Sequence, residues 1–108
     1  DLSSLRCVTT GGAAVPKQMA LDFETRFHIP VLEGYGLTET SPVVSFNKVE
    51  SNRLGSVGKP LWGSLLRIQR EDGSFAGPGE IGEVILRGPQ DRVAIPLLSH
   101  KELVQVRE

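Results

Sequence analysis

Residues 34–40 (GYGLTET) place an aromatic ring, two hydroxyl groups and a carboxylate within one short stretch of the chain. The two glycines of this stretch allow the backbone to come close to a ligand. The ring of Tyr35 can stack on a nucleobase, the hydroxyl of Thr38 can donate to a phosphoryl oxygen, and the carboxylate of Glu39 is a hard ligand suited to Mg²⁺. The stretch therefore has the parts of half a nucleotide site, although a strand-end turn is the commoner explanation of such a short motif taken alone.

A second glycine pair lies upstream, and a predicted strand precedes each glycine-rich segment. Residues 5–10 (LRCVTT) form a short β-rich run, predicted to be a buried strand, that stops at Gly11 and Gly12. A second short apolar run stops at Gly34 and Gly36.

The pattern between the two strands predicts an amphipathic helix. Pro16 suits the first helical position, and Pro30 blocks continuation of the helix. Apolar residues recur between them at helical spacing, at Met19, Ala20, Phe23 and Phe27. A strand-helix-strand connection of this length usually makes a right-handed crossover, so we expect parallel strands whose carboxyl ends share one edge of the sheet. Ligands of α/β sheets bind beyond that edge, where both glycine-rich segments would lie.

The second half of the chain has the pattern of a small antiparallel β-unit. Residues 64–70 (SLLRIQR) and 83–87 (EVILR) are short apolar runs that alternate with polar residues. Asp72 and Gly73 form a strong tight-turn dipeptide between them. We therefore expect two antiparallel strands beside the α/β part.

The last residues of the chain fit more than one structure. Ser99 and Glu102 have capping-box spacing, whereas residues 103–106 (LVQV) suit a strand equally well. The expected organisation is an α/β part, a small β-subdomain piece and an unmatched tail, over residues 1–50, 51–90 and 91–108.

Four segments together resemble the adenylate-forming (AMP-binding) superfamily, which includes acyl-CoA synthetases, luciferases and peptide-synthetase adenylation domains. They are similar to its Gly-Gly-Ala segment, its signature Tyr-Gly-x-Thr-Glu loop, a pocket-lining segment and a strand of its small β-subdomain, at residues 5–14, 34–39, 55–60 and 79–89. The resemblance covers roughly residues 1–90, and residues 37–42 (LTETSP) look most like fatty-acid–CoA ligases. It implies an α/β fold, namely the parallel strand-helix-strand edge of the superfamily's large N-terminal domain with a small antiparallel β-unit.

The resemblance also implies a role for each matching residue. Tyr35 would stack on adenine, Thr38 would contact the α-phosphate of ATP or of the acyl-adenylate, and Glu39 would hold Mg²⁺. Thr38 and Glu39 are thus the candidate catalytic residues. The backbone that approaches the bound AMP moiety would come from Gly11, Gly12, Ala13, Gly34 and Gly36. The path to the carboxylate being activated would be lined by Gly36, Val57 and Gly58.

The implied reaction is that of an ATP-dependent acid–CoA ligase, which activates a carboxylic acid, here expected to be a fatty acid, as an acyl-adenylate and then forms the CoA thioester. The superfamily's phosphate loop, ribose-binding aspartate and lysine-bearing C-terminal domain match no part of these 108 residues. We therefore expect the chain to be inactive alone. Two alternatives are a non-catalytic module that binds nucleotide or acyl-adenylate, and a truncated structural fragment that self-associates through exposed apolar surface.

Charge and composition narrow the classes of partner. The 12 basic and 13 acidic residues give a net charge of −1, so neither nucleic acid nor an anionic membrane is an expected partner. No apolar stretch approaches the roughly 20 residues that a transmembrane helix needs. The chain has no initiating Met, so we expect an internal segment whose targeting signal is not visible. The single Cys7 excludes an internal disulfide and favours a reducing compartment, by default the cytoplasm.

Three further residues are assigned no chemistry. His28 follows the predicted helix, where a histidine commonly interacts with the free carbonyl groups. Cys7 lies within an apolar pattern and is expected in the core. Trp62 suits either a pocket wall or the core of the β-unit.

Overall fold

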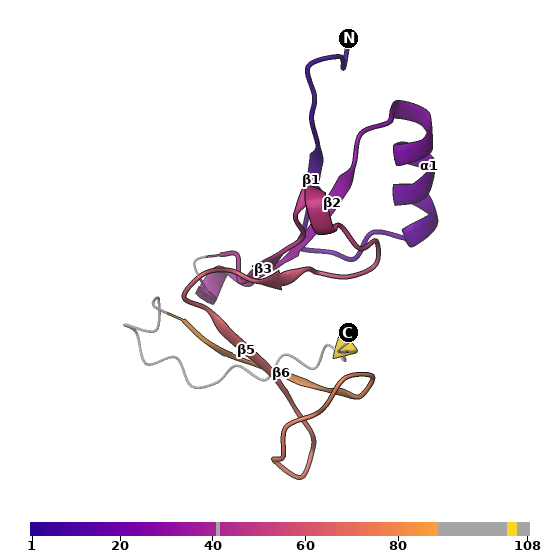
Figure 1. The fold of residues 1–108 in the computed structure, drawn as a ribbon. Helices are drawn as coiled ribbons and strands as arrows, with labels where there is room; N and C mark the ends of the chain where they lie inside the picture. The colour runs from indigo at the N-terminus through magenta and orange to yellow at the C-terminus, as the bar shows by residue number, and fades with distance from the viewer. Residues whose placement is uncertain (41, 89–103, 106–108) are drawn as a thin grey trace. The chain divides into compact units, whose positions relative to one another are not determined.

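The computed structural model describes residues 1–40, 42–88 and 104–105, and the chain forms two compact units, Asp1–Leu61 and Trp62–Glu108 (Figure 1). The capping-box spacing of Ser99 and Glu102 lies outside the described residues. No helix in the part of the chain that the structure describes has the length and apolar character to cross a membrane.

The first unit contains a four-stranded mixed sheet in the order β1-β2-β3-β4. Its strands are β1 (Val8–Thr10), β2 (Val31–Tyr35), β3 (Ser45–Phe46) and β4 (Lys59–Pro60). β1 and β2 are parallel, and β3 pairs antiparallel with β2 on one side and with β4 on the other. Short 3₁₀ turns, η1 (Thr38–Thr40) and η2 (Val49–Ser51), flank β3. The expected parallel strand-helix-strand arrangement is therefore confirmed, because both predicted strands meet in register and α1 (Lys17–Phe27) connects them.

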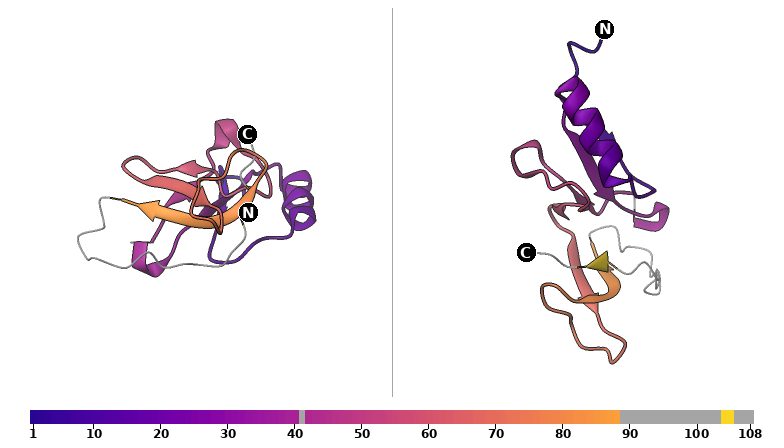
Figure 2. Two further views of the ribbon diagram at one scale, coloured as in Figure 1. Left: turned by 90° about the horizontal axis from the view of Figure 1, so that it is seen from below. Right: turned by 90° about the vertical axis from the view of Figure 1, so that its right-hand side faces the viewer.

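The helix α1 lies against β2 and ends with a left-handed residue (Figures 1 and 2). Pro16 is the N-cap of α1, one position before the first helical position that the sequence predicts for it. His28 terminates it with φ 56°, and the His28 N–H donates to the Glu24 carbonyl at 2.8 Å. His28 therefore ends the helix, as predicted. Its contact with a helix carbonyl group is made by its backbone N–H and not by its imidazole ring.

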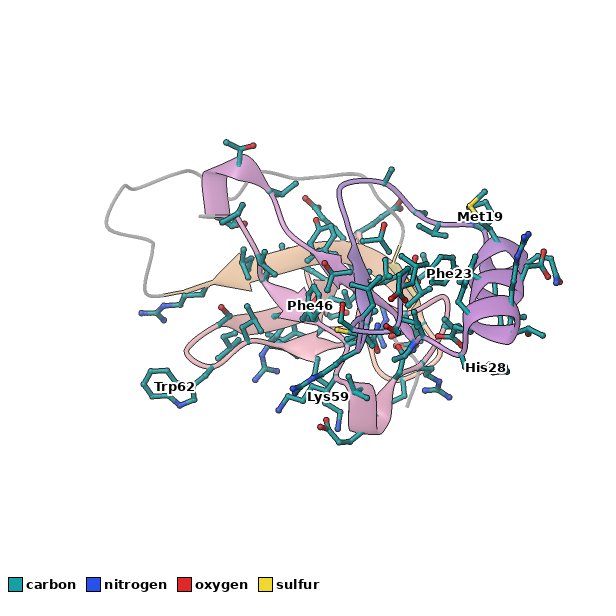
Figure 3. The ribbon with its side chains drawn as sticks, turned by 90° about the horizontal axis from the view of Figure 1, so that it is seen from above. Met19, Phe23, His28, Phe46, Lys59 and Trp62 are labelled. Carbon is teal, nitrogen blue, oxygen red and sulfur yellow. The ribbon has the colours of Figure 1, made fainter. Side chains whose placement is uncertain are left out.

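The apolar face of α1 is narrower than its sequence pattern predicts. Ala20 is buried, whereas Met19 is 62% exposed. Met19 points away from the strands and Phe23 points toward them (Figure 3). The rings of Phe23 and Phe27 pack on each other with their centroids 4.7 Å apart.

The core of the first unit is small and centres on β2. It consists of Ala20, Ile29, Val31, Leu32 and Val44. The prediction of a buried strand over residues 5–10 is wrong in two respects, because the strand starts only at Val8 and its central Thr9 is exposed. Cys7 is half-buried instead of lying in the core, since the sheet ends at β1 and no described strand covers its outer edge.

The second unit is a small antiparallel sheet in the order β5-β6-β7. The pairing of β5 with β6 confirms the two antiparallel strands that the sequence predicts, and β7 lies where the sequence left the choice between a helix and a strand open. Its strands are β5 (Leu65–Gln69), β6 (Ile81–Arg87) and β7 (Val104–Gln105). Gly73 turns the chain after β5 with φ 84°, and its N–H donates to the Arg70 carbonyl at 3.0 Å. Trp62 is fully exposed, so in the structure it forms neither a pocket wall nor part of a core (Figure 3).

Candidate functional site

A cavity of about 410 Å³ lies at the carboxyl ends of the two parallel strands. Its lining comes from the end of β1, the end of β2, the loop that follows β2, and β3. The lining residues are Thr9, Thr10, Gly11, Gly12, Gly34, Tyr35, Gly36, Leu37, Thr38, Pro42, Val43 and Phe46. The volume lies within the range of small-molecule sites, which is roughly 300 to 1,000 Å³. The sequence predicts that both glycine-rich segments lie at the carboxyl ends of the strands, and in the structure both segments border this one cavity.

The two glycine-rich segments touch through their backbones. A methyl group at Gly11 would stand 3.1 Å from the carbonyl oxygen of Gly34, which is tighter than ordinary van der Waals contact. Gly12 has φ 81°, a conformation that side-chain-bearing residues rarely adopt. The strand ends therefore come together because neither segment carries a side chain at the point of closest approach.

The loop after β2 is held by a turn that leaves Thr38 free to face the cavity. The Thr40 hydroxyl accepts the Leu37 N–H at 3.0 Å and donates to the Leu37 carbonyl at 2.8 Å. Gly36 packs so closely on the Pro42 carbonyl that no side chain fits there. Thr38 is exposed, and its hydroxyl makes no hydrogen bond to any residue that the structure describes. Thr40 thus has a structural task that the sequence did not reveal.

Apolar side chains form one wall of the cavity. Leu37, Pro42 and Val43 come from the loop, and Phe46 comes from β3. None of the four was predicted from the sequence to form a wall of the site, because their convergence depends on the chain reversal through η1. The only available signal was the apolar run of residues 42–44 just downstream of the motif.

Among the predicted site residues whose side chains the structure describes, Ala13, Val57 and Gly58 do not line this cavity. Gly58, with φ 79°, packs against the backbone of Phe46 from outside the cavity. The Ser45 hydroxyl donates to the Val57 carbonyl at 2.9 Å, which ties the same segment to β3. In this structure Val57 and Gly58 therefore support the Phe46 wall. Their predicted contact with a substrate stays a prediction.

The side chains that line the cavity are all uncharged. The backbone of Glu39 lies in η1, and its carboxylate is outside what the structure describes. Among the described residues no three His, Cys, Asp or Glu side chains gather where they would hold a metal ion. The cavity offers an aromatic ring, hydroxyl groups, backbone groups and an apolar wall, which suit the base, the phosphoryl oxygens and the acyl part of an acyl-adenylate.

The sequence matches the AMP-binding enzyme family over residues 1–93. The chain belongs to this family. Relatives of this AMP-binding segment include the indoleacetate–CoA ligase of Aromatoleum aromaticum, 38% identical over 82% of this chain and 18% of that protein. The long-chain-fatty-acid–CoA ligase of Bacillus subtilis is 40% identical over 83% of this chain and 16% of its own length.

A solved structure of an anthranilate–CoA ligase, AuaEII, in complex with anthranoyl-AMP matches the AMP-binding segment with a TM-score of 0.77. The two are 32% identical, and the match covers 83% of this chain and 17% of that one. The segment thus spans less than a fifth of the length of these relatives. The resemblance drawn from the sequence motifs is confirmed at the level of family and fold.

Proposed function

We propose that this chain forms the adenylate-binding face of an ATP-dependent acid–CoA ligase. The observation that carries the proposal is that both glycine-rich segments border the same cavity as Tyr35 and Thr38. The relatives named as CoA ligases, and a structural neighbour that holds an acyl-AMP, support the same reaction.

Four of the lining residues have a direct task in this reaction. Tyr35 stacks on adenine, and the backbone at Gly11 and Gly12 closes the other side of the base. The Thr38 hydroxyl donates to an oxygen of the α-phosphate, where negative charge grows as the substrate carboxylate attacks phosphorus and pyrophosphate leaves. The thiol of CoA then attacks the acyl carbonyl carbon and loses its proton, the bond from that carbon to the phosphate oxygen breaks, and AMP leaves, which yields the thioester. Glu39 is the candidate ligand for Mg²⁺, which would neutralise phosphate charge at this end of the site.

For the acid we propose a fatty acid. The Leu37, Val43 and Phe46 wall is apolar and supports an apolar acyl group. The printed names of the relatives include indoleacetate and a long-chain fatty acid, whose common part is a carboxylate on an apolar body. Of these two acids, the fatty acid is favoured by residues 37–42 (LTETSP), which resemble the corresponding stretch of fatty-acid–CoA ligases.

The direct test is a titration of the purified chain with a fatty-acyl sulfamoyl-adenosine, in which a sulfamate replaces the phosphate. We expect the amide signals of Gly11, Gly34 and Gly36 to shift together in NMR spectra. Tyr35→Leu removes the stacking face and is expected to weaken binding by about tenfold or more. Tyr35→Phe keeps the ring and serves as the matched control.

Two outcomes would count against the proposal. Binding weaker than millimolar would mean that the cavity is not an adenylate site. Equal affinity for the mimic and for a fatty acid without adenosine would mean that Tyr35 and the glycine segments do not bind the nucleotide. The same titration with an indoleacetyl mimic compares the two acyl classes.

A further inference from the structure

The carboxylate of Glu33 connects two segments that are far apart in the sequence. Glu33 lies on β2 directly before Gly34, is half-buried, and does not line the cavity. Its Oε1 accepts the Val15 N–H at 3.2 Å, and its Oε2 accepts the Gly55 N–H at 3.1 Å. One side chain therefore holds both the segment after the first glycine pair and the segment that begins at Gly55.

The backbone of Glu33 holds the same region through a buried side chain. Asn47 is only 3% exposed, and both its N–H and its Nδ2 donate to the Glu33 carbonyl, at 3.0 and 3.1 Å. The Asn47 Oδ1 accepts the Arg53 N–H at 3.2 Å, and its Nδ2 also donates to the Ser56 carbonyl. The loop over residues 47–56 is thus folded back onto the end of β2, which brings the Gly55 amide within reach of the Glu33 carboxylate.

The bond to Val15 also fits the charge of the adjoining helix. The first turn of α1 contains no acidic residue, and Pro16 provides no side-chain cap. Negative charge near a helix N-terminus is favourable, because the first N–H groups of the helix lack partners within it. Glu33 brings that charge from the neighbouring strand, so the helix start and the loop before it are fixed to β2.

We propose that Glu33 is a positioning residue of the adenylate site, one that fixes the Gly11–Gly12 and Gly55–Gly58 segments relative to the Gly34–Gly36 backbone. The proposal rests on the proposed function, because positioning has meaning only where the cavity binds an adenylate. Glu33 acts at a distance from the ligand. A small displacement of supporting residues is enough to weaken a site whose groups are set by backbone contact.

Two measurements on the 108-residue chain test the positioning, and the first needs no ligand. In Glu33→Ala both amides lose their acceptor, and we expect hydrogen exchange at Val15 and Gly55 to accelerate by about tenfold. Glu33→Gln keeps one carbonyl oxygen, so only one of the two amides is expected to keep slow exchange. Glu50→Gln, at an exposed position of the same unit, removes the same charge and should change neither amide.

The second measurement is the affinity for the fatty-acyl sulfamoyl-adenosine. We expect a loss of about tenfold in Glu33→Ala and a smaller loss in Glu33→Gln, with no change in Glu50→Gln. Unchanged exchange at both amides in Glu33→Gln would overturn the proposal, and this variant decides the matter if Glu33→Ala does not fold. Faster exchange with unchanged affinity would also overturn it, because Glu33 would then hold loops without positioning the site. A wild-type chain that binds no mimic defeats the proposed function, and the exchange data then still decide whether Glu33 fixes the two segments.

Discussion

The ring of Phe46 packs directly on the backbone of Gly34, so that a side chain at Gly34 would collide with Cδ2 and Cε2 of that ring. Both residues line the cavity, one from β2 and one from the antiparallel strand β3, where they are paired in register. The ring of Phe46 therefore occupies the space that a side chain at Gly34 would need. At this point the apolar wall and the motif backbone are therefore in direct contact.

Gly34→Ala is expected to destabilise the first unit by about 1–3 kcal/mol, because the added methyl group must displace Phe46 or the strand pairing. Urea denaturation followed by amide signals of β2 measures the change. Gly77→Ala is the control, since a methyl group there meets only Glu80 Oε2, at an ordinary 3.5 Å. In the double variant Gly34→Ala with Phe46→Ala, the two costs should not add, because the collision is gone. Additive costs would mean that the collision is relieved elsewhere.

Thr38→Val tests the phosphate contact of the proposed function. The substitution keeps the shape of the side chain and removes the hydroxyl, so the loss should appear in ligand binding and not in stability. A hydrogen bond to a charged group contributes roughly 1.5–3 kcal/mol, which corresponds to at least about a tenfold weaker affinity for the sulfamoyl-adenosine mimic. Thr25→Val, on the exposed face of α1, is the matched control. Equal affinity in both variants would remove Thr38 from the site.

The parallel β1-α1-β2 arrangement could be predicted from the sequence because its signals are local. Glycine pairs mark both strand ends, prolines bracket the helix, and the apolar spacing between them is helical. The strand β3, Ser45–Phe46, gives no comparable signal, since two residues carry no period. Phe46 was consequently missed as a cavity wall, although its position opposite Gly34 follows once the chain is seen to reverse after η1.

Contacts between segments that are far apart in the chain could not be predicted from the sequence. Glu33 stands next to the signature loop, yet nothing in its neighbours indicates that its carboxylate reaches Val15 and Gly55. Burial was predicted poorly for the same reason, as Met19 and Trp62 show. A periodic pattern indicates which residues share a face but leaves open whether another element covers that face.

The β5–β6 hairpin should lose stability in acid. The Gly77 N–H and the Arg70 guanidinium donate to the Glu80 carboxylate, and these bonds hold the pKa of Glu80 below its ordinary value of 4.5. A carboxylate with a lowered pKa in the folded state stabilises the fold above its unfolded pKa, and that contribution is lost as the pH falls through the folded pKa. Wild type should thus exceed Glu80→Gln in stability at neutral pH, and the difference should shrink as the pH falls below 4.5.

Urea denaturation between about pH 7 and pH 3, followed by amide signals of β5 and β6, measures this difference. Glu71→Gln removes an exposed carboxylate near the same turn and is the control. A difference between wild type and Glu80→Gln that stays constant across the range would show that the bonds to Gly77 and Arg70 do not depend on the charge of Glu80.

The chain alone is expected to bind an adenylate without forming one. Attack on the α-phosphate concentrates negative charge on the phosphoryl oxygens, and catalysis of this step depends on cations or strong donors placed around them. The lining side chains of the cavity are all uncharged, and Thr38 is a single neutral donor. The charges that stabilise the transition state must therefore come from groups other than those that line the cavity.

Exchange of labelled pyrophosphate into ATP measures the adenylation step directly. The purified chain should show no exchange above background with fatty acids, indoleacetate or anthranilate, while the long-chain-fatty-acid–CoA ligase of Bacillus subtilis serves as the positive control. Turnover at a comparable rate would contradict the expectation, and loss of that turnover in Thr38→Val would then place the chemistry in this cavity. Binding of the mimic without exchange is the expected result, because stacking and hydroxyl contacts recognise the adenylate whereas forming it requires charge that these side chains do not carry.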